Sequence, residues 1–161
     1  MTETTIRLAQ RNEDMGPLRA LMVALQDRQR QENPDLPTGE ELVDGYLKYM
    51  WRRIDKHRGQ LILAEQGGQL VGFLSVLTHK PRREPDDPAK EHAEIAELYV
   101  DPQVRGQGIA RRLVDRAAEC AREAAVAELR VGAAADNQAV AQLYGHLGFR
   151  PLMTLYGKKV L

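Results

Sequence analysis

The residues best suited to chemistry lie in Ile95–Leu113, which reads IAELYVDPQVRGQGIARRL. An apolar, β-branched stretch leads through Asp101-Pro102 into a glycine-rich loop, and the pattern predicts a helix from about Gly108. A helix N-terminus carries unpaired N–H groups and partial positive charge, so it attracts anions. Gly106 and Gly108 have no side chain to hold a phosphate away from these groups. The guanidinium of Arg105 adds a positive charge with several N–H donors. The segment therefore predicts a cradle for a phosphorylated cofactor.

Two familiar phosphate loops do not fit this segment. A nucleotide triphosphate loop needs Lys-Ser or Lys-Thr after its last glycine, and Gly108 is followed by Ile109-Ala110. A dinucleotide loop needs a third glycine where this chain has Arg111, and it normally follows the first strand of its domain. Neither nucleotide hydrolysis nor dinucleotide-dependent redox chemistry is expected.

A third pattern does fit, because Gln103–Gly108 matches Q/R-x-x-G-x-G/A, the acetyl-CoA signature of the GNAT superfamily of N-acetyltransferases. A second block, Asn137–Phe149, resembles that superfamily's other characteristic segment through Ala141, Tyr144 and the final Gly-Phe. An ordinary glycine-rich turn is the alternative for the first block. The two blocks in this order favour the resemblance, which covers essentially the whole chain.

The resemblance implies an α/β (α+β) fold in one domain over residues 1–161. Its sheet is expected to be mixed and strongly twisted, with six to seven strands and about four helices. The local patterns agree with this order of elements. Strands are predicted at 5–8, 61–65, 70–77, through the motif, at 129–131 and from Phe149. The first two helices are predicted from Asn12 as N-cap to about Arg30, and from the Thr38/Glu41 capping box to about Lys56. Two further helices are predicted, one from Gly108 and one from Asn137 to Gly148. Gly67-Gly68 predicts a hairpin, and residues 80–92 predict an exposed loop.

The same resemblance assigns the cofactor contacts. It implies main-chain pairing of the pantetheine arm of acetyl-CoA with Leu98 and Val100, and a contact to that arm from Asn137. The pyrophosphate is expected on main-chain N–H groups of the loop and first helical turn. Those residues are Arg105, Gly106, Gln107, Gly108, Ile109 and Ala110.

Catalysis needs an acid for the departing thiolate and a base for the acceptor ammonium. Tyr144 matches the superfamily tyrosine proposed to protonate the CoA sulfur, although it could instead be a packed residue. Glu97 is our choice of base, with Glu94 as the alternative, because residues three apart on a regular strand face opposite sides unless a bulge intervenes. Many superfamily members carry the acidic residue one position earlier, where this chain has Ala96. Asn137 could equally be only a helix N-cap.

The acceptor is expected to be a primary amine, on a small molecule or on a protein lysine or N-terminus, attacked directly in a ternary complex. Carboxylates and aromatic residues in the expected second helix and the loop before the motif would suit a cation, but they are equally typical of a core face and solvated loops. The alternative function is a non-catalytic acyl-CoA-binding module of the same fold. The third hypothesis is that the chain is an interaction protein whose glycine-rich loop matches the signature by coincidence.

Composition limits the other partners. The chain has 23 Lys plus Arg and 23 Asp plus Glu, so net charge gives no indication of nucleic-acid binding. The four histidines and the lone Cys120 show no metal-ligand spacing, so no metal is expected, and Cys120 is expected to pack in a helix. No apolar stretch is long enough to span a bilayer, which predicts a cytoplasmic protein without membrane contact. A homodimer is possible, but no sequence feature decides it.

Overall fold

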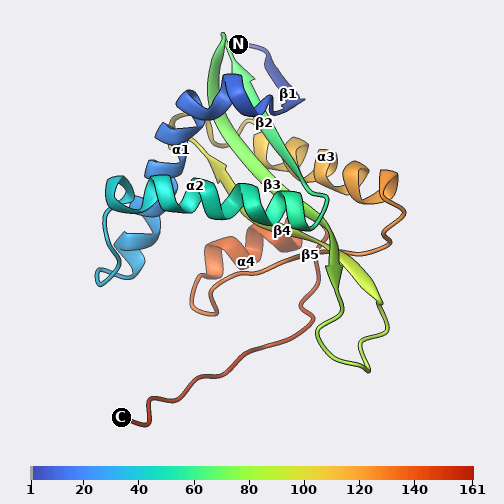
Figure 1. Ribbon diagram of the computed structural model, residues 1–161. Helices are drawn as coiled ribbons and strands as arrows, with labels where there is room; N and C mark the ends of the chain where they lie inside the picture. Colours follow the sequence, from blue (N-terminus) through green and yellow to red (C-terminus); the bar gives the residue numbers. More distant parts are fainter. Residues whose placement is uncertain (1) are drawn as a thin grey trace.

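The structure is a computed structural model that describes residues 2–161. A twisted sheet runs through its centre, with helices on both faces (Figure 1). The elements in chain order are β1 (Thr4–Leu8), α1 (Arg11–Glu32), α2 (Gly39–Lys56), β2 (Gln60–Gln66), β3 (Gln69–Pro81), β4 (Glu91–Val100), a 3₁₀ turn (Pro102–Val104), α3 (Ile109–Glu123), β5 (Leu129–Val131) and α4 (Gln138–His146).

The five strands lie in the order β1-β2-β3-β4-β5. The first four pair antiparallel, and only β4 and β5 are parallel, which makes the sheet mixed as predicted. The chain passes through α3 between β4 and β5, which is the crossover that a parallel pair requires.

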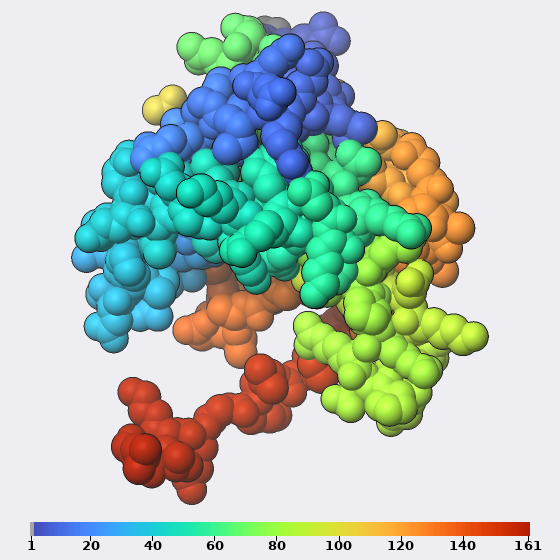
Figure 2. Space-filling model, viewed as in Figure 1, coloured from blue at the N-terminus to red at the C-terminus, as the bar shows by residue number. Residues whose placement is uncertain are grey.

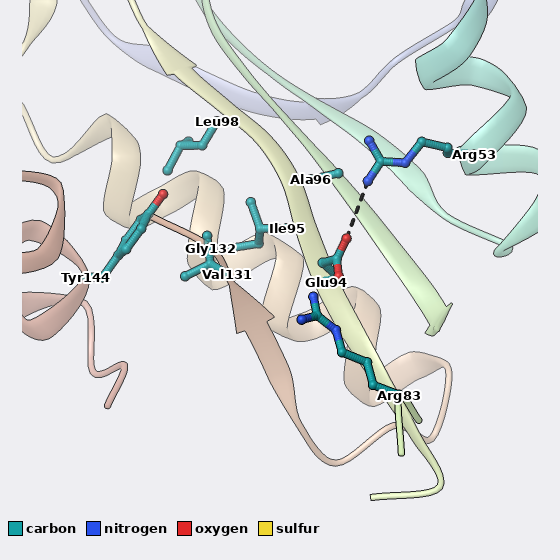
Figure 3. Close-up of a pocket in the computed structure, with 9 residues that line it drawn as sticks. All are labelled: Arg53, Arg83, Glu94, Ile95, Ala96, Leu98, Val131, Gly132 and Tyr144. Atoms are coloured by element: carbon teal, nitrogen blue, oxygen red, sulfur yellow. Dashed lines mark hydrogen bonds and ion pairs between the residues drawn. The ribbon is translucent and has the colours of Figure 1, made fainter. Parts of the chain in front are cut away.

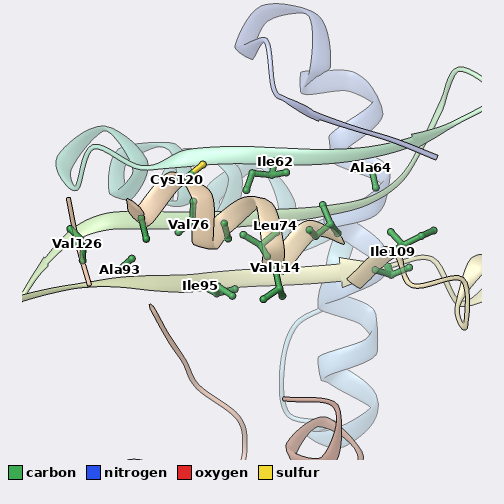
Figure 4. Close-up of a cluster of buried hydrophobic side chains, with 14 of the residues drawn as sticks. Ile62, Ala64, Leu74, Val76, Ala93, Ile95, Ile109, Val114, Cys120 and Val126 are labelled. Carbon is green, nitrogen blue, oxygen red and sulfur yellow. The ribbon is translucent and has the colours of Figure 1, made fainter. Parts of the chain in front are cut away.

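Two apolar layers fix the helices to the sheet, because successive strand residues point to opposite faces. Leu61 and Leu63 pack with α1 and α2 on one face, around the buried Phe73. Ile62 between them faces α3 on the other side, where Leu113 and Ala117 are fully buried (Figure 4). Cys120 lies in this second layer, which confirms its predicted packing role.

The helix starts follow local hydrogen bonds. Thr38 accepts a bond from the Glu41 N–H while the Glu41 carboxylate accepts one from the Thr38 N–H, which confirms the predicted capping box. The predicted N-cap of α1 at Asn12 is wrong: the helix begins at Arg11, with Gln10 as its cap, two residues earlier than predicted. The reason is the carboxylate of Asp14, which accepts the Gln10 N–H at 2.7 Å.

The hairpin between β2 and β3 confirms the prediction at Gly67-Gly68. Both glycines have positive φ, 54° and 78°, which is the conformation that tight hairpin turns need. The strands around the next loop are longer than predicted, since β3 runs to Pro81 and β4 starts at Glu91. The connecting loop is therefore 82–90 rather than 80–92.

β4 and β5 share only three residue pairs, the last joining Ile95 and Val131. β4 continues to Val100, whereas β5 ends at Val131. In the described part of the chain, the edge of β4 from Ala96 to Val100 has a strand neighbour on the β3 side alone. Beyond Ile95, the edge of β4 that faces β5 is therefore left unpaired.

The predicted strand from Phe149 is not formed, and the expected count of six to seven strands becomes five in residues 2–161. Segment 150–161 is extended but belongs to no strand, and every residue in it is exposed. Pro151 has no N–H to donate at the point where such a strand would begin. The end of a helix at Gly148 does not by itself supply a strand neighbour, and this segment leads away from the sheet (Figure 1).

Within residues 2–161, no helix combines the length and the hydrophobicity needed to cross a membrane.

Candidate active site and cofactor cradle

The glycine loop before α3 has the geometry of an anion site. Gly106 and Gly108 have φ of 78° and 74°, in the left-handed region that favours glycine. A Cβ added at either position would meet no protein atom within 4 Å, so the space above the loop is open. Gly108 caps α3 without a side-chain hydrogen bond, and the first turn of the helix contains no acidic residue. Nothing negatively charged in that turn competes with an incoming phosphate.

Cations surround this loop, and their contacts fix how they point. Arg105 donates through Nε to the Val100 carbonyl at 3.2 Å, which leaves its terminal nitrogens for a ligand. Arg111 donates to the His146 carbonyl at 2.6 Å and Arg112 to the Thr4 carbonyl at 2.8 Å, so both tie α3 to its neighbours. Gln107 is held by Gln66 at 2.9 Å. Side-chain charge at the cradle therefore comes mainly from Arg105.

A pocket of about 240 Å³ lies at the other end of the free β4 edge. It is lined by Arg53 of α2, Arg83 of the 82–90 loop, Glu94, Ile95, Ala96 and Leu98 of β4, Val131 and Gly132 after β5, and Tyr144 of α4. Figure 3 shows Leu98 and Tyr144 on one side of the pocket, with Arg53, Arg83 and Glu94 on the other. The pocket thus joins the predicted cofactor side of the site to a polar, charged side.

Tyr144 occupies the pocket wall with its ring packed edge-on against Phe149, at 5.8 Å between centroids. Its hydroxyl makes no hydrogen bond to the described residues and points toward the Leu98 side of the pocket (Figure 3). Burial raises the pKa of the Tyr144 phenol. The hydroxyl therefore stays protonated near neutral pH and is free to donate.

A bulge in β4 changes the directions of its two glutamates. Ser75 pairs with Glu97 and the next β3 residue, Val76, pairs with Ile95, so Ala96 is an extra residue on β4. Three-residue spacing would otherwise put Glu94 and Glu97 on opposite faces. The bulge brings both to the α2 side, where the guanidinium of Arg53 contacts Glu94 at 3.4 Å and Glu97 at 3.1 Å.

The two carboxylates have different surroundings. Glu97 is buried, with 2% of its side chain exposed, and accepts hydrogen bonds from Ser75 Oγ, from Tyr46 Oη at 3.0 Å and from Arg53. Burial and the Glu97 charge raise the pKa of the Tyr46 phenol. Glu94 is 18% exposed and lines the pocket, whereas Glu97 does not. Of the two glutamates, only Glu94 presents its carboxylate to the pocket.

The loop over the pocket is anchored by a two-bond ion pair. Arg130 of β5 donates to both carboxylate oxygens of Asp87, at 2.8 and 3.0 Å. This guanidinium holds the pKa of Asp87 near 2. His92, fully enclosed beside this pair, has its pKa lowered by burial and by Arg130. The pair holds the 82–90 loop against the sheet, and with it Arg83.

The structure confirms the prediction that Asn137 caps α4. Its side-chain oxygen accepts the Val140 N–H at 3.1 Å, and its amide nitrogen donates to Glu32 of α1 at 3.3 Å. It does not line the pocket. Its contact with a cofactor arm stays a prediction.

Sequence reasoning missed the two arginines of the pocket, Arg53 and Arg83. The acidic residues considered for the acceptor are largely paired elsewhere: Glu40 with Arg19, Asp87 with Arg130, and Glu41 within the capping box. A contact between α2 and β4 leaves no local signal in the chain, so Arg53 could not have been recognised from spacing. The one available clue was that Arg53 lies in the last turn of α2, close in sequence to the loop that leads into β2.

Comparison with known proteins agrees with this geometry. The model of the acetyltransferase (GNAT) family matches residues 22–149, which include the cradle, β4 and α4. The chain belongs to the GNAT family of acetyltransferases.

Among relatives, an uncharacterized N-acetyltransferase of Methanocaldococcus jannaschii is 31% identical over 65% of this chain and 43% of its own length. N-acetyltransferase 8F1 of Mus musculus is 30% identical over 68% of this chain and 46% of its own. The chain thus spans less than half the length of these curated relatives.

Solved structures support the same fold. The aminoglycoside antibiotic 6'-N-acetyltransferase of Acinetobacter baumannii superposes with a TM-score of 0.73, at 22% identity, over 99% of both chains. Another structure of similar fold, at a TM-score of 0.70 and 17% identity over 100% of this chain and 97% of that one, is an aminoglycoside N-acetyltransferase in complex with CoA. At these identities the likeness concerns the fold, and it confirms the predicted α/β GNAT architecture.

Proposed function

We propose that this protein transfers an acetyl group from acetyl-CoA to a primary amine, by direct attack in a ternary complex. The observation that carries the proposal is the free edge of β4, which runs from the glycine cradle to the pocket that Tyr144 and Glu94 share. A ligand long enough to reach both ends, with a phosphate at one and a reactive group at the other, fits this arrangement.

Acetyl-CoA has these properties. Its pyrophosphate is assigned to the main-chain N–H groups of the cradle, from Arg105 through Gly106, Gln107, Gly108 and Ile109 to Ala110, because the open space there would be filled by any side chain. Its pantetheine amides are assigned to the main chain of Leu98 and Val100 on the unpaired edge, as an added strand would be. Asn137, at the start of α4, is assigned a contact to the same arm.

The chemistry follows from the pocket. The acceptor ammonium gives one proton to the Glu94 carboxylate, directly or through water, and the free amine attacks the thioester carbonyl. When the carbon–sulfur bond breaks, the thiolate takes the proton of the Tyr144 hydroxyl, and the nitrogen loses its second proton to solvent. Solvent then returns a proton to Tyr144 and removes the one held by Glu94. The extra residue of the bulge, Ala96, has no register partner on β3, and its backbone N–H is assigned as a donor to the thioester oxygen.

Glu97, our choice of base from the sequence, is assigned a positioning role. Its buried carboxylate holds Arg53, and Arg53 holds Glu94. Glu97 thus supports proton transfer without touching the acceptor. Variants of both glutamates are compared below to test this assignment.

The acceptor is a primary amine on a small molecule or on a protein lysine or N-terminus. Figure 2 shows a hollow below α2, framed by the lime 82–90 loop and the red 150–161 segment, with α4 behind it. Access from this side suits an amine carried on a larger body. The charged lining of Arg53, Arg83 and Glu94 suits a polar acceptor, since a purely apolar one would take water away from these groups without replacing its hydrogen bonds.

Titration calorimetry with acetyl-CoA is the first test, with NAD and ATP as controls. Selective micromolar binding is expected, and a panel of amines is then assayed for release of CoA thiol. Failure of acetyl-CoA and CoA to bind to folded protein would overturn the proposal. Tight binding with no transfer to any amine or to a lysine-rich peptide library would indicate an acyl-CoA-binding module instead.

A further inference from the structure

Arg83 is the second cation of the pocket, and acetyl transfer by Tyr144 and Glu94 does not use it. Arg53 is held between Glu94 and Glu97, so both of its terminal nitrogens already have carboxylate partners. Arg83 forms no ion pair with any residue that the structure describes, although it lines the same pocket. The pocket therefore contains one guanidinium whose hydrogen-bond donors are available to a ligand.

The backbone around Arg83 is fixed by hydrogen bonds on both sides. The N–H of Arg82 donates to the Lys90 carbonyl at 3.0 Å, which closes the loop at its base. The N–H of Asp87 donates to the Glu84 carbonyl at 3.1 Å, which forms a turn directly after Arg83. Figure 3 shows the Arg83 side chain extended from this loop toward β4. The loop thus presents a guanidinium on the side of the pocket that lies away from the cofactor.

The charge of Arg83 also acts on the interior of the protein. His92 on β4 is 1% exposed, and burial lowers the pKa of its imidazole, with further contributions from Arg130 and Arg83. The carboxylates of Glu94 and Asp87 oppose this effect. Arg83 therefore lies close enough for its charge to act on the strand that carries the proposed base.

Charge balance decides which acceptors suit the pocket. The guanidiniums of Arg53 and Arg83 are matched by two carboxylates, those of Glu94 and the enclosed Glu97. An acceptor that brings one ammonium and one anion leaves this balance unchanged, and each new charge meets an opposite one. A diamine would instead bring a second ammonium toward Arg83, and like charges at short distance repel. A guanidinium also offers paired N–H donors that match the oxygens of a carboxylate or a phosphate.

The size of the pocket limits how far the anion lies from the amine. Its volume of about 240 Å³ is below the roughly 300–1,000 Å³ of sites that enclose a drug-sized ligand. Only the reacting end of an acceptor therefore fits, together with the groups next to it. An anion that reaches Arg83 while the amine lies at Glu94 must be within a few bonds of that amine.

We propose that Arg83 determines acceptor specificity by binding an anionic group, a carboxylate or a phosphate, next to the acceptor amine. The preferred acceptor is a compact zwitterion such as an amino acid or a phosphorylated amino alcohol, with its ammonium at Glu94 and its anion at Arg83. This assignment rests on the proposed acetyl transfer, because it names the class of amine that the pocket accepts. The guanidinium does not touch the reacting atoms, so its effect is expected in the KM of the acceptor rather than in kcat.

The first experiment compares acceptors of similar length: β-alanine, its amide, 1,3-diaminopropane and O-phosphoethanolamine. A second series compares L-amino acids with their amides, because it changes the distance between amine and anion. Release of CoA thiol should show that wild type prefers the anionic acceptors over the amides by about tenfold or more in kcat/KM. The better of the carboxylate and the phosphate identifies the group that Arg83 binds. A preference for the amides or the diamine would overturn the inference and leave acetyl transfer to an amine intact.

Arg83→Gln tests the residue itself, and Arg82→Gln is the matched control, because Arg82 is an exposed neighbour that does not line the pocket. Arg83→Gln should raise the KM of the anionic acceptors by about 10- to 100-fold, as expected for loss of a charge-assisted hydrogen bond, and leave the amides unchanged. Arg83→Lys keeps the charge without the paired donors and should recover part of the loss. An equal change for acids and amides would mean that Arg83 acts only through Glu94 or the loop, and would overturn the inference.

Calorimetry keeps failure of this inference apart from failure of the proposed function. Wild type, Arg83→Gln and Arg82→Gln should bind acetyl-CoA with equal affinity, because Arg83 lies on the acceptor side of the pocket. Absence of acetyl-CoA binding in wild type would overturn the proposed function and this inference with it. Intact binding and turnover without any preference for anionic acceptors would overturn the inference alone.

Discussion

Glu94 and Glu97 lie three residues apart on β4 and still contact the same guanidinium, that of Arg53, at 3.4 and 3.1 Å. The extra residue Ala96 makes this possible, because it shifts the alternation of β4 by one position. One carboxylate is enclosed and the other faces the pocket. The bulge therefore puts two carboxylates on one side of β4 in different surroundings, one enclosed and one at the pocket.

Exchange of each glutamate for glutamine should affect a different property, stability for Glu97 and turnover for Glu94. Glu97→Gln is expected to destabilise the protein by about 1–3 kcal/mol, because the enclosed donors lose a charged acceptor. Glu94→Gln should change the free energy of unfolding by less than about 1 kcal/mol, because the Glu94 carboxylate is partly solvated. The same variant should lower kcat at least tenfold, because it removes the assigned base. Urea unfolding and steady-state rates measure the two quantities. Wild-type kcat in Glu94→Gln would remove Glu94 as the base.

Tyr144→Phe removes the hydroxyl that is assigned to protonate the thiolate. We expect kcat to fall by about 10²-fold, the usual contribution of a positioned acid, with little change in affinity for acetyl-CoA. Release of CoA thiol gives the rate, and calorimetry gives the affinity. Tyr156→Phe, at a tyrosine that is 90% exposed, is the matched control and should retain the wild-type rate. Equal rates for both variants would take Tyr144 out of the mechanism.

Gly106→Glu places a bulky anion in the open space of the cradle, so acetyl-CoA binding should be lost. The φ of 78° adds strain for any side chain, and Gly106→Ala is the control that carries this strain without the charge. Both variants should lose about 1–2 kcal/mol of stability, as expected for a left-handed non-glycine residue. Calorimetry should show weakened binding in the alanine variant and none in the glutamate variant. Unchanged affinity in Gly106→Glu would show that the phosphate lies elsewhere.

The Asp87–Arg130 pair predicts an acid-dependent loss of stability. The pKa of Asp87 is about 2 when folded and near 3.8 when free, so the pair stabilises the protein above about pH 4 and this stabilisation disappears as pH falls toward 2. Asp87→Asn should lower the melting temperature at pH 7 and much less at pH 2. Thermal unfolding of both proteins across this range measures the difference. A constant difference between the two melting curves would mean that the ion pair does not contribute.

The sequence was sufficient where structure depends on neighbours along the chain. The glycines of the cradle, the Thr38–Glu41 capping box and the Gly67-Gly68 turn each depend on a few adjacent residues, and each was predicted. Contacts between distant segments were not accessible in the same way. Arg53 reaches Glu94 across 41 positions, and the Ala96 bulge is defined only by its register against β3. The missing last strand has the same cause, because the end of a helix at Gly148 predicts a new element without supplying the neighbour that a strand needs.

Cys120, the chain's one cysteine, is 3% exposed in the layer beneath α3, and burial raises the pKa of its thiol. A thiol that is both enclosed and protonated reacts slowly with labelling reagents. Any modification of native protein therefore reports an opening of α3 from the sheet. The wild-type sequence already contains a single-site probe of its own unfolding rate, and acetyl-CoA, if it binds at the start of α3, should slow that labelling.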